Sequence, residues 1–424
     1  MAFIAPTGLT LAFISGLFRF CTLKSLPFFP VYSWVGLWTS LFFTLLGLGG
    51  SSQLIRFCTR FTDEVFNGLL SLNFIYEALA SLRRNFKQAD PMNLTTPFVA
   101  LAMALTTFSS TMAVTAFESS KFFNQKIRSI VKDFGPVVIF VAMSFINSLS
   151  AFKKFGVPTL SVPDKFQLAG GRDFLVPLNS IPLRIKLLCS LPAILLTALF
   201  YMDQNISVRV VNNPDNGLKK GPAYNLDMVA LGLITGVLSL FGLPWMCGAT
   251  VQSMNHVRAM TEVEFNPEKQ EMEIKEVTET RLTGFVIHAL VASSLLLLPA
   301  IRNVPIPVVS GVFLFLGRKL MSGNSFLQRL RDIFVEKKRL PDDHPMKFMG
   351  RKRMTVFTMI QMFCLMGLWT FKQNPSTAIF FPSVIGMLMV IRSFLLPKFF
   401  TEDELTELGD PTPSKHLDEW AEMH

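Results

Sequence analysis

The sequence predicts an all-α polytopic membrane protein, because of its composition and its long uncharged stretches. Half of the 424 residues are hydrophobic, only 17% are charged, and 42 are phenylalanine. Several stretches run for about eighteen or more residues without a charge, which the core of a soluble protein does not require. They include Ser25 to Ile55, Met92 to Phe117, Phe134 to Phe152, Met228 to Val257 and Leu282 to Ile301.

These stretches, together with shorter apolar runs, give about twelve spans. We predict them at roughly residues 3–21, 31–55, 62–83, 97–117, 134–152, 185–210, 226–245, 248–260, 281–302, 304–320, 354–372 and 376–396. Residues 1–396 form the predicted transmembrane domain, and residues 397–424 an acidic C-terminal tail. From Glu402 on we expect that tail to be solvated and partly disordered. A docking site for a soluble partner is the alternative interpretation.

Basic loops indicate how the spans are oriented. Segments 118–133, 211–225 and 318–353 carry clustered Lys and Arg, and counting crossings places all three on the face of the C-terminal tail. Short loops rich in Lys and Arg remain in the cytoplasm, so that face is predicted to be cytoplasmic. These loops also explain the net charge of +10, and no nucleic-acid partner is predicted.

The sequence shows no sign of catalysis or of a bound cofactor. Its five cysteines form no C-x-x-C pair, so neither a disulfide framework nor a zinc site is supported. We find no P-loop, no haem-ligand spacing and no catalytic constellation. The sequence therefore predicts neither an enzyme nor an ATP-driven pump, and it predicts no cofactor and no resident metal.

The stretch FGLPWMCGATVQSMNHVRAM, Phe241 to Met260, interrupts an apolar run where a membrane helix should continue. Pro244 removes a backbone donor and disfavours helix at the preceding residue, and Gly242 weakens the helix further. Hydrocarbon tolerates such a break only where protein or a watery cavity surrounds it. A helix that restarts at Gly248-Ala249-Thr250 presents a partly positive N-terminus, which suits an anion. A helical kink or an interfacial turn is the alternative.

Two further features favour a binding site. Asp203 ends an apolar run and shares a helix face with Ser207, and a carboxylate at that depth costs about 2.5–3.5 kcal/mol. The segment Ala5-Pro6-Thr7-Gly8 places small, helix-disfavouring residues before another apolar run. Paired broken segments in the two halves of a transporter indicate a midplane site between facing half-helices. An interfacial Asp and an ordinary capped first span are the alternatives.

Several long colinear blocks carry a resemblance that reaches to about Pro397. They are VALGLITGVLSLFGLPWMCGATVQSMNHVRAM, RFTDEVFNGLLSLNFIYEAL, LSVPDKF, MDQNISVRVVNNPDNGLKKGPAYNLDM, VTETRLTGFVIHALV, IPVVSGVFLFLG and MTVFTMIQMFCLMGLWTFK. Together they resemble the bicarbonate transporter family, which includes the band 3 anion exchangers and the sodium-bicarbonate cotransporters.

The resemblance implies a fourteen-span fold, a seven-plus-seven inverted repeat with core and gate domains, of which about twelve spans are expected here. Substrate in the family binds between two half-helix N-termini, which match Thr7 and Gly8 on one side and Ala249, Thr250 and Val251 on the other. The implied function is secondary transport of bicarbonate or carbonate by alternating access, with a role in pH regulation. The implied protein is a homodimer in the lipid bilayer, at the plasma membrane by family default.

The sequence departs from the family pattern at several positions. It begins at the third span, which suggests a fragment, a truncated gene model or a chain completed by a partner. Gln252 stands where exchangers carry an Arg. Asp203-Gln204 stands where they carry Glu-Ser, and it matches the residues of the sodium-coupled members. At the outer vestibule Ser81 replaces a usual Lys, whereas Lys372 matches the other outer lysine.

A charge balance favours coupling to sodium. Two half-helix N-termini supply roughly +1 in total, and an ionised Asp203 cancels it. Without an Arg at position 252, such a site is poor for a monoanion. A transported Na⁺ beside Asp203, with the hydroxyls of Ser207 and Thr7 as further ligands, would restore the positive charge. The alternatives are a Na⁺-independent chloride-bicarbonate exchanger, a borate transporter and, from another class, a non-transporting scaffold.

Overall fold

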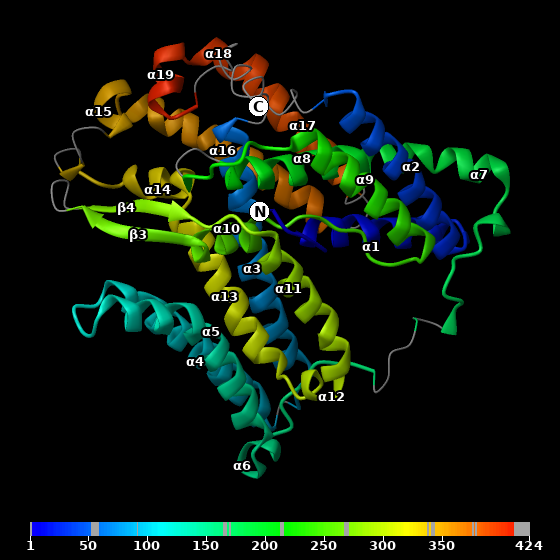
Figure 1. Cartoon of the computed structure of the whole chain (residues 1–424), viewed down its shortest axis with the longest axis horizontal. Coiled ribbons are helices and arrows are strands. Elements are labelled where there is room, and N and C mark those ends of the chain that lie inside the picture. Colours follow the sequence, from blue (N-terminus) through cyan, green and yellow to red (C-terminus); the bar gives the residue numbers. More distant parts are fainter. Residues whose placement is uncertain are drawn as a thin grey trace. The chain divides into compact units, whose positions relative to one another are not determined.

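The computed structural model describes residues 2–51, 59–90, 92–163, 168, 171–212, 216–266, 271–336, 339–340, 344–374, 377 and 380–410. These residues are mainly helical, and their strands form two two-stranded sheets (Figure 1). The prediction of an all-α polytopic membrane protein is confirmed. The chain divides into two compact units. The first comprises Met1–Phe66, Leu168–Val286 and Asp332–His424, and the second Asn67–Gln167 and Ile287–Arg331.

The elements of the described residues follow one another along the chain with these bounds. They are β1 (Ile4–Ala5), α1 (Gly8–Leu23), α2 (Phe28–Leu48), α3 (Arg60–Gln88), α4 (Thr95–Ala116), the 3-10 turn η2 (Phe117–Ser119), α5 (Gln125–Ser148), α6 (Ser150–Lys153), η4 (Leu178–Ser180), α7 (Leu183–Leu188), α8 (Ser190–Val211), α9 (Tyr224–Leu240), β2 (Cys247–Gly248), α10 (Thr250–Ala259), β3 (Thr261–Asn266), β4 (Glu271–Val277), α11 (Arg281–Ser293), η6 (Ser294–Leu297), α12 (Leu298–Ile301), α13 (Ile306–Ser322), α14 (Ser325–Asp332), α15 (Pro345–Met349), α16 (Arg351–Gln373), α17 (Phe381–Val390), the π-helical turn η9 (Ile391–Leu395), α18 (Leu396–Phe399) and α19 (Glu402–Glu407).

Each predicted span coincides with at least one helix, although the helices differ in length. Among the described residues, seven helices are long and apolar enough to cross a membrane, and the α13–α14 pair, bent by 72°, makes an eighth if it counts as one span. The apolar helices α1 and α9 are shorter, α17 continues through η9 into α18, and α10 has ten residues. A rise of about 1.5 Å per residue leaves ten residues well short of a hydrocarbon core of about 30 Å.

In the first unit, α2 and α9 pack closely because glycines face small polar side chains. A Cβ added at Gly232 would lie 2.4 Å from Thr44 Oγ1, and one at Gly236 would lie 2.7 Å from Ser40 Oγ. Small residues allow membrane helices to approach in this way, since lipid supplies no hydrophobic driving force between them. This packing fixes the position of α9, whose C-terminal end leads into the interrupted stretch.

The second unit is organised around α4, α5 and α13, with α4 and α5 lying side by side (Figure 1). Its buried core is formed by Ala100, Met103, Val157 and Val308. A Cβ added at Gly311 would lie 2.5 Å from the Ala104 carbonyl oxygen, so α13 touches the backbone of α4. Of the predicted site residues, only Ser81 belongs to this unit.

The first part of the predicted tail forms a short helix with some buried side chains. Helix α19 begins in a capping box, and its Glu404 forms an ion pair with Arg353, with 2.9 Å between Oε1 and Nη1. Arg392 and Asp410 form an ion pair in which both side chains are almost fully buried. Residues 402–410 are therefore held by capping and by charge pairing, while Glu402, Asp403 and Glu407 are exposed. The rest of the tail, residues 411–424, lies outside the described residues.

Candidate functional site

Helix α9 ends in a tight turn at the predicted break. Gly242 adopts a φ of +58°, a conformation that a residue without a Cβ accepts readily. The Leu243 N–H donates back to the Leu238 carbonyl at 2.8 Å, as in common helix C-caps. Arg172 donates to the carbonyl oxygens of Phe241 and Gly242 at 2.8 and 3.2 Å, so the exposed carbonyls at the helix end have a cationic partner. The stretch is a true interruption of the helix and not a kink.

Trp245 anchors the interrupted stretch to α2. Its side chain is fully buried and stacks on Tyr32, with ring centroids 3.9 Å apart. The Trp245 indole N–H donates to Ser239 Oγ at 2.9 Å, while its backbone N–H donates to Tyr32 Oη at 3.2 Å. Tyr32 Oη in turn donates to the Leu243 carbonyl at 2.6 Å. Protein side chains therefore satisfy backbone groups that the break frees, as a position inside the bilayer requires.

The chain then pairs with its own N-terminus and brings two helix starts together. Strands β1 and β2 are antiparallel, with Ile4 opposite Gly248 and Ala5 opposite Cys247. The Ala249 N–H extends this pairing by donating to the Phe3 carbonyl at 2.7 Å. Helix α1 starts shortly after β1 and helix α10 shortly after β2. The two short helices therefore begin beside the β1–β2 pair, a place that we call the crossing.

Helix α8 passes directly against this crossing, and Gly248 sets the distance. A Cβ added at Gly248 would lie 2.8 Å from Ser207 Cβ and 3.0 Å from Gln204 Oε1. Contacts that short do not occur for real side chains without a shift of the backbone. Gln204 Oε1 is buried and has no hydrogen-bond partner among the described residues, and a buried unpaired acceptor of this kind suggests a water or an ion.

Asp203 of α8 lies at the N-terminal end of α1. Its side chain is 3% exposed, and its Oδ2 accepts hydrogen bonds from Thr7 Oγ1 at 3.0 Å and from Cys247 Sγ at 2.8 Å. Thr7 is the N-cap of α1 and accepts from the Thr10 N–H at 3.3 Å. The carboxylate thus occupies the electropositive end of one half-helix, where negative charge is stabilised.

Ser207, one turn further along α8, contacts the start of the other half-helix. Its Oγ lies 2.6 Å from Thr250 Oγ1, 3.1 Å from the Gly248 carbonyl oxygen and 2.7 Å from the Asp203 carbonyl oxygen. The residue before α10 is Ala249, so no side chain at its N-cap accepts from the first N–H groups. The two half-helices therefore differ, since α1 begins with a capping Thr and a carboxylate whereas α10 begins uncapped.

The other predicted site residues occupy different surroundings. Gly8 and Gln252 are exposed, and Val251 is half-buried in the first turn of α10. Lys372, on α16, has its Nζ 5.6 Å from the centroid of the Trp369 ring. Ser81, on α3, belongs to the other unit. The described residues contain no group of three or more His, Cys, Asp or Glu side chains that could hold a metal ion.

Sequence reasoning missed three residues of this site. Cys247 donates to Asp203, Trp245 anchors the break, and Arg172 caps the end of α9. Trp245 and Cys247 follow directly after the Gly-Leu-Pro signal, so their nearness to the break could have suggested them. Arg172 carries no such signal, because it lies 69 positions before Phe241 in the sequence.

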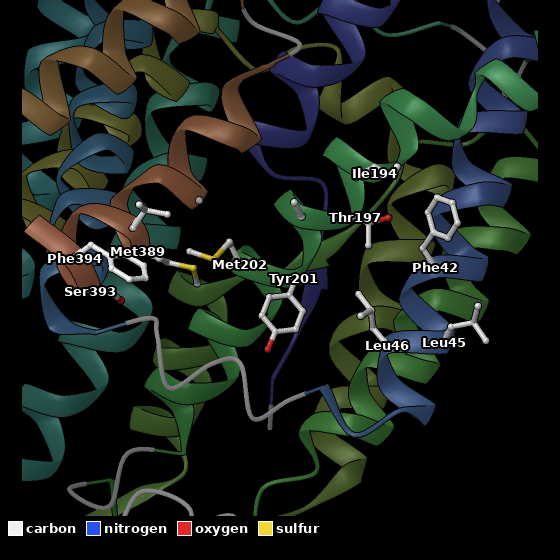
Figure 2. A pocket seen from close by; sticks show the side chains of 13 residues that line it. Phe42, Leu45, Leu46, Ile194, Thr197, Tyr201, Met202, Met389, Ser393 and Phe394 are labelled. Atoms are coloured by element: carbon white, nitrogen blue, oxygen red, sulfur yellow. The ribbon is translucent and has the colours of Figure 1, made fainter. Parts of the chain in front are cut away.

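A separate apolar cavity of about 850 Å³ lies on another side of α8, between α2, α17 and η9 (Figure 2). Its walls are Phe42, Leu45, Leu46, Ile194, Thr197, Ala198, Tyr201, Met202, Gly386, Met389, Val390, Ser393 and Phe394. Thr197 and Tyr201 donate their hydroxyl hydrogens to backbone carbonyls at 2.7 and 2.8 Å. None of the lining residues is charged, so this cavity does not provide an ion site.

Comparison with known proteins establishes the family. A family model described as the HCO3⁻ transporter integral membrane domain matches residues 1–100 and 88–413. The chain belongs to the bicarbonate transporter family. The resemblance seen in the sequence is thereby confirmed, and proteins of this family are membrane transporters rather than enzymes.

Curated members of the bicarbonate transporter family match nearly the whole chain. The human band 3 anion transport protein is 30% identical over 97% of this chain and 48% of its own length. The rat sodium bicarbonate cotransporter 3 is 29% identical over 97% of this chain and 39% of its own. The human sodium-driven chloride bicarbonate exchanger is 30% identical over 97% of this chain and 43% of its own length. This chain thus spans about half the length, or less, of the curated relatives it matches.

A solved structure is also similar. The transmembrane domain of the cyanobacterial bicarbonate transporter BicA matches with a TM-score of 0.48 and 17% identity, over 86% of this chain and 82% of its own.

Proposed function

We propose that this chain carries bicarbonate or carbonate across a membrane together with Na⁺, and that both ions bind where α1, α8 and α10 meet. The relatives support the substrate class, since their names refer to anion transport, sodium-bicarbonate cotransport and sodium-driven chloride-bicarbonate exchange. The choice of Na⁺ coupling rests on the residues at the crossing.

The observation that carries the proposal is the position of Asp203 against the capped start of α1. A half-helix N-terminus is equivalent to roughly half a positive charge, so one carboxylate offsets both half-helix ends of the crossing. Gln252, at the start of α10, adds no charge. The crossing is therefore close to neutral until a cation binds, and a Na⁺ beside Asp203 provides the positive charge that attracts an anion.

The crossing offers oxygen atoms that suit a hard cation such as Na⁺. Two donors already engage Asp203 Oδ2, and the other carboxylate oxygen is the natural ligand. The hydroxyls of Ser207 and Thr250 lie 2.6 Å apart beside the same strand. The unpaired Gln204 Oε1 is a further candidate ligand, because it approaches Gly248 from the same helix.

The uncapped start of α10 is the complementary seat for the anion. The N–H groups of Thr250, Val251 and Gln252 face no capping side chain at the N-cap position, and such N–H groups bind anions together with the helix dipole. Bicarbonate or carbonate bound there would face a Na⁺ held by Asp203 and Ser207 across a short distance. The two ions would thus stabilise each other, which is the physical basis of coupling.

Na⁺-independent anion exchange is the second candidate function, favoured by the 30% identity to human band 3. Under that alternative the anion binds without a cation, and an exposed Gln252 takes the place that an Arg fills in the exchangers. We further propose a homodimer in the plasma membrane with a cytoplasmic C-terminus, and an outer vestibule lined by Lys372 and Ser81.

The experiment is the recovery of intracellular pH in bicarbonate buffer, in cells that express the chain, with Na⁺ present or replaced. We expect recovery that needs both Na⁺ and bicarbonate and that the Asp203→Asn variant loses. Asp227→Asn, a carboxylate at the start of α9 that no part of the proposal uses, serves as the matched control. Recovery that depends on chloride and not on Na⁺ would favour anion exchange. Na⁺-dependent recovery in the Asp203→Asn variant would refute the role of Asp203 in Na⁺ coupling.

A further inference from the structure

Cys247 lies at the crossing, where the proposed function assigns it no role beyond its hydrogen bond to Asp203. The side chain is fully buried, and its Sγ donates to Asp203 Oδ2 at 2.8 Å. The hydroxyl oxygens of Thr7 and Thr10, both from the start of α1, lie 3.5 Å from the same sulfur. One thiol therefore contacts α1 and α8 from the strand that precedes α10.

Backbone pairing fixes the position of this thiol. Cys247 is opposite Ala5 in the antiparallel pair of β1 and β2, so its side chain cannot slip along the strand without breaking that register. The next residue, Gly248, allows the strand to approach α8 to within direct contact of Ser207 and Gln204. The contact between Sγ and Oδ2 thus follows from the construction of the crossing and not from a flexible side chain.

The chemistry of a thiol suits it to hold the carboxylate rather than the cation. A thiol is a weak hydrogen-bond donor, and its soft sulfur is a poor ligand for a hard ion that prefers oxygen. Cys247 and Thr7 both donate to the same carboxylate oxygen. Two donors from different elements restrain the Asp203 carboxylate through this oxygen, and neither of them occupies the other one.

We propose that Cys247 is a positioning residue for the transported cation, and that its thiol fixes the Asp203 carboxylate in the orientation that binds Na⁺. The inference rests on the proposed function, because it deepens the account of the same site. Removal of the thiol leaves the charge of Asp203 and the hydrogen bond from Thr7 intact but takes away one of the two donors that restrain the carboxylate, so the affinity for Na⁺ falls while the transport machinery remains.

The kinetic test compares Cys247→Ala with Cys247→Ser in purified protein reconstituted into liposomes. Hydrogen bonds to charged groups are worth enough to change an equilibrium by about tenfold. We therefore expect the half-saturating Na⁺ concentration of Cys247→Ala to rise about tenfold with little change in maximal rate. Cys247→Ser keeps a hydroxyl donor and should restore the wild-type value. Cys364→Ala, a thiol of α16 outside the crossing, is the matched control.

Two kinetic results would overturn the inference. One is an unchanged half-saturating concentration in Cys247→Ala, and the other is a Cys247→Ser variant as impaired as Cys247→Ala, which would indicate packing instead of hydrogen bonding. A wild-type chain without any Na⁺ dependence would instead refute the proposed function, so the two failures are distinguishable.

An infrared measurement tests the contact without relying on transport. The wild-type minus Cys247→Ser difference spectrum isolates the S–H stretching band of this one thiol, because the other four cysteines cancel. We expect a band lowered in frequency by donation to a carboxylate, and a shift toward the free-thiol frequency in the Asp203→Ala background. A band that is the same in both backgrounds would show that the thiol does not donate to Asp203.

Discussion

Gly248 illustrates how a single missing side chain builds the proposed site. Strand β2 contacts α8 because no Cβ stands between Gly248 and the side chains of Ser207 and Gln204. That approach brings Cys247 within hydrogen-bond distance of Asp203 and places Thr250 beside Ser207. The three helices therefore meet through backbone proximity at one residue.

Gly248→Ala should separate these elements. The added methyl group would lie 2.8 Å from Ser207 Cβ, so the strand must shift, and overpacking of this kind costs about 1–3 kcal/mol. We expect Na⁺-dependent bicarbonate flux to fall about tenfold, because the shift should cost about as much as the loss of one hydrogen bond to a charged group. Gly386→Ala is the control, because a Cβ there meets nothing within 4 Å. Equal flux from both variants would show that the close approach is not required.

Residue contacts at the site were only partly predictable from the sequence. Polar residues and helix breaks are conspicuous in apolar runs, and they singled out Asp203, Ser207, Thr7 and Thr250. Their partners could not, since Thr7 and Asp203 are 196 positions apart. No local pattern states that a thiol and a hydroxyl donate to the same carboxylate oxygen. The position of the thiol depends on the register between β1 and β2. Two-residue strands are too short for the sequence to predict that register.

At the scale of elements, the pairing of α2 with α9 supports the break. Helix α9 holds Ser239, which accepts from the Trp245 indole, while α2 holds Tyr32, which stacks on the same ring. A change in the spacing of these helices would therefore be transmitted to the strand at Cys247 and Gly248. Glycines on α9 set that spacing.

Gly236→Leu should push α9 away from α2. Even the first carbon of the new side chain would lie 2.7 Å from Ser40 Oγ, and small residues at such interfaces are what allow membrane helices to pack. We expect a lower midpoint of thermal unfolding, equivalent to a loss of about 1–3 kcal/mol. Gly367→Leu on α16, where a Cβ meets nothing within 4 Å, controls for the added bulk. A midpoint equal to that of the control would contradict the packing role.

Elements were predicted well where hydrophobic runs were long and poorly where they were short. All twelve expected spans contain a helix, because about eighteen apolar residues have few other ways to satisfy their backbone in a bilayer. The hairpin of β3 and β4, which pairs Thr261 with Val277, was missed. Its alternation of polar and apolar residues in TEVEFN and EMEIKEV is a strand signal that the count of spans did not consider.

At the scale of the whole molecule, the chain returns to its first unit near its C-terminal end. Asp410 forms a buried ion pair with Arg392 and also accepts from the Phe61 N–H at 3.3 Å, close to the start of α3. Helix α19 lies between Arg392 and Asp410 in the sequence, and its Glu404 forms an ion pair with Arg353. Composition alone suggested a solvated tail, because acidic residues are normally exposed and their partners lie elsewhere in the sequence.

Asp410→Ala should therefore destabilise the protein strongly. It leaves the Arg392 guanidinium buried without its carboxylate, and breaking one side of a buried pair costs about 3–5 kcal/mol. We expect a clear drop in the thermal unfolding midpoint of the purified protein. Glu402→Gln, an exposed carboxylate of the same segment, should leave the midpoint unchanged. Equal midpoints for the two variants would mean that the C-terminal segment does not contribute to stability.

Coupling of the cation at Asp203 is tested most directly by the uptake of radioactive Na⁺ into liposomes that contain only the purified chain. We predict uptake driven by an inward bicarbonate gradient in the wild type, with no uptake by Asp203→Asn and normal uptake by Asp227→Asn. This outcome would place cation coupling at the crossing of the two half-helices. Bicarbonate-driven Na⁺ uptake that persists in Asp203→Asn, or bicarbonate flux without any Na⁺ movement in the wild type, would contradict the account.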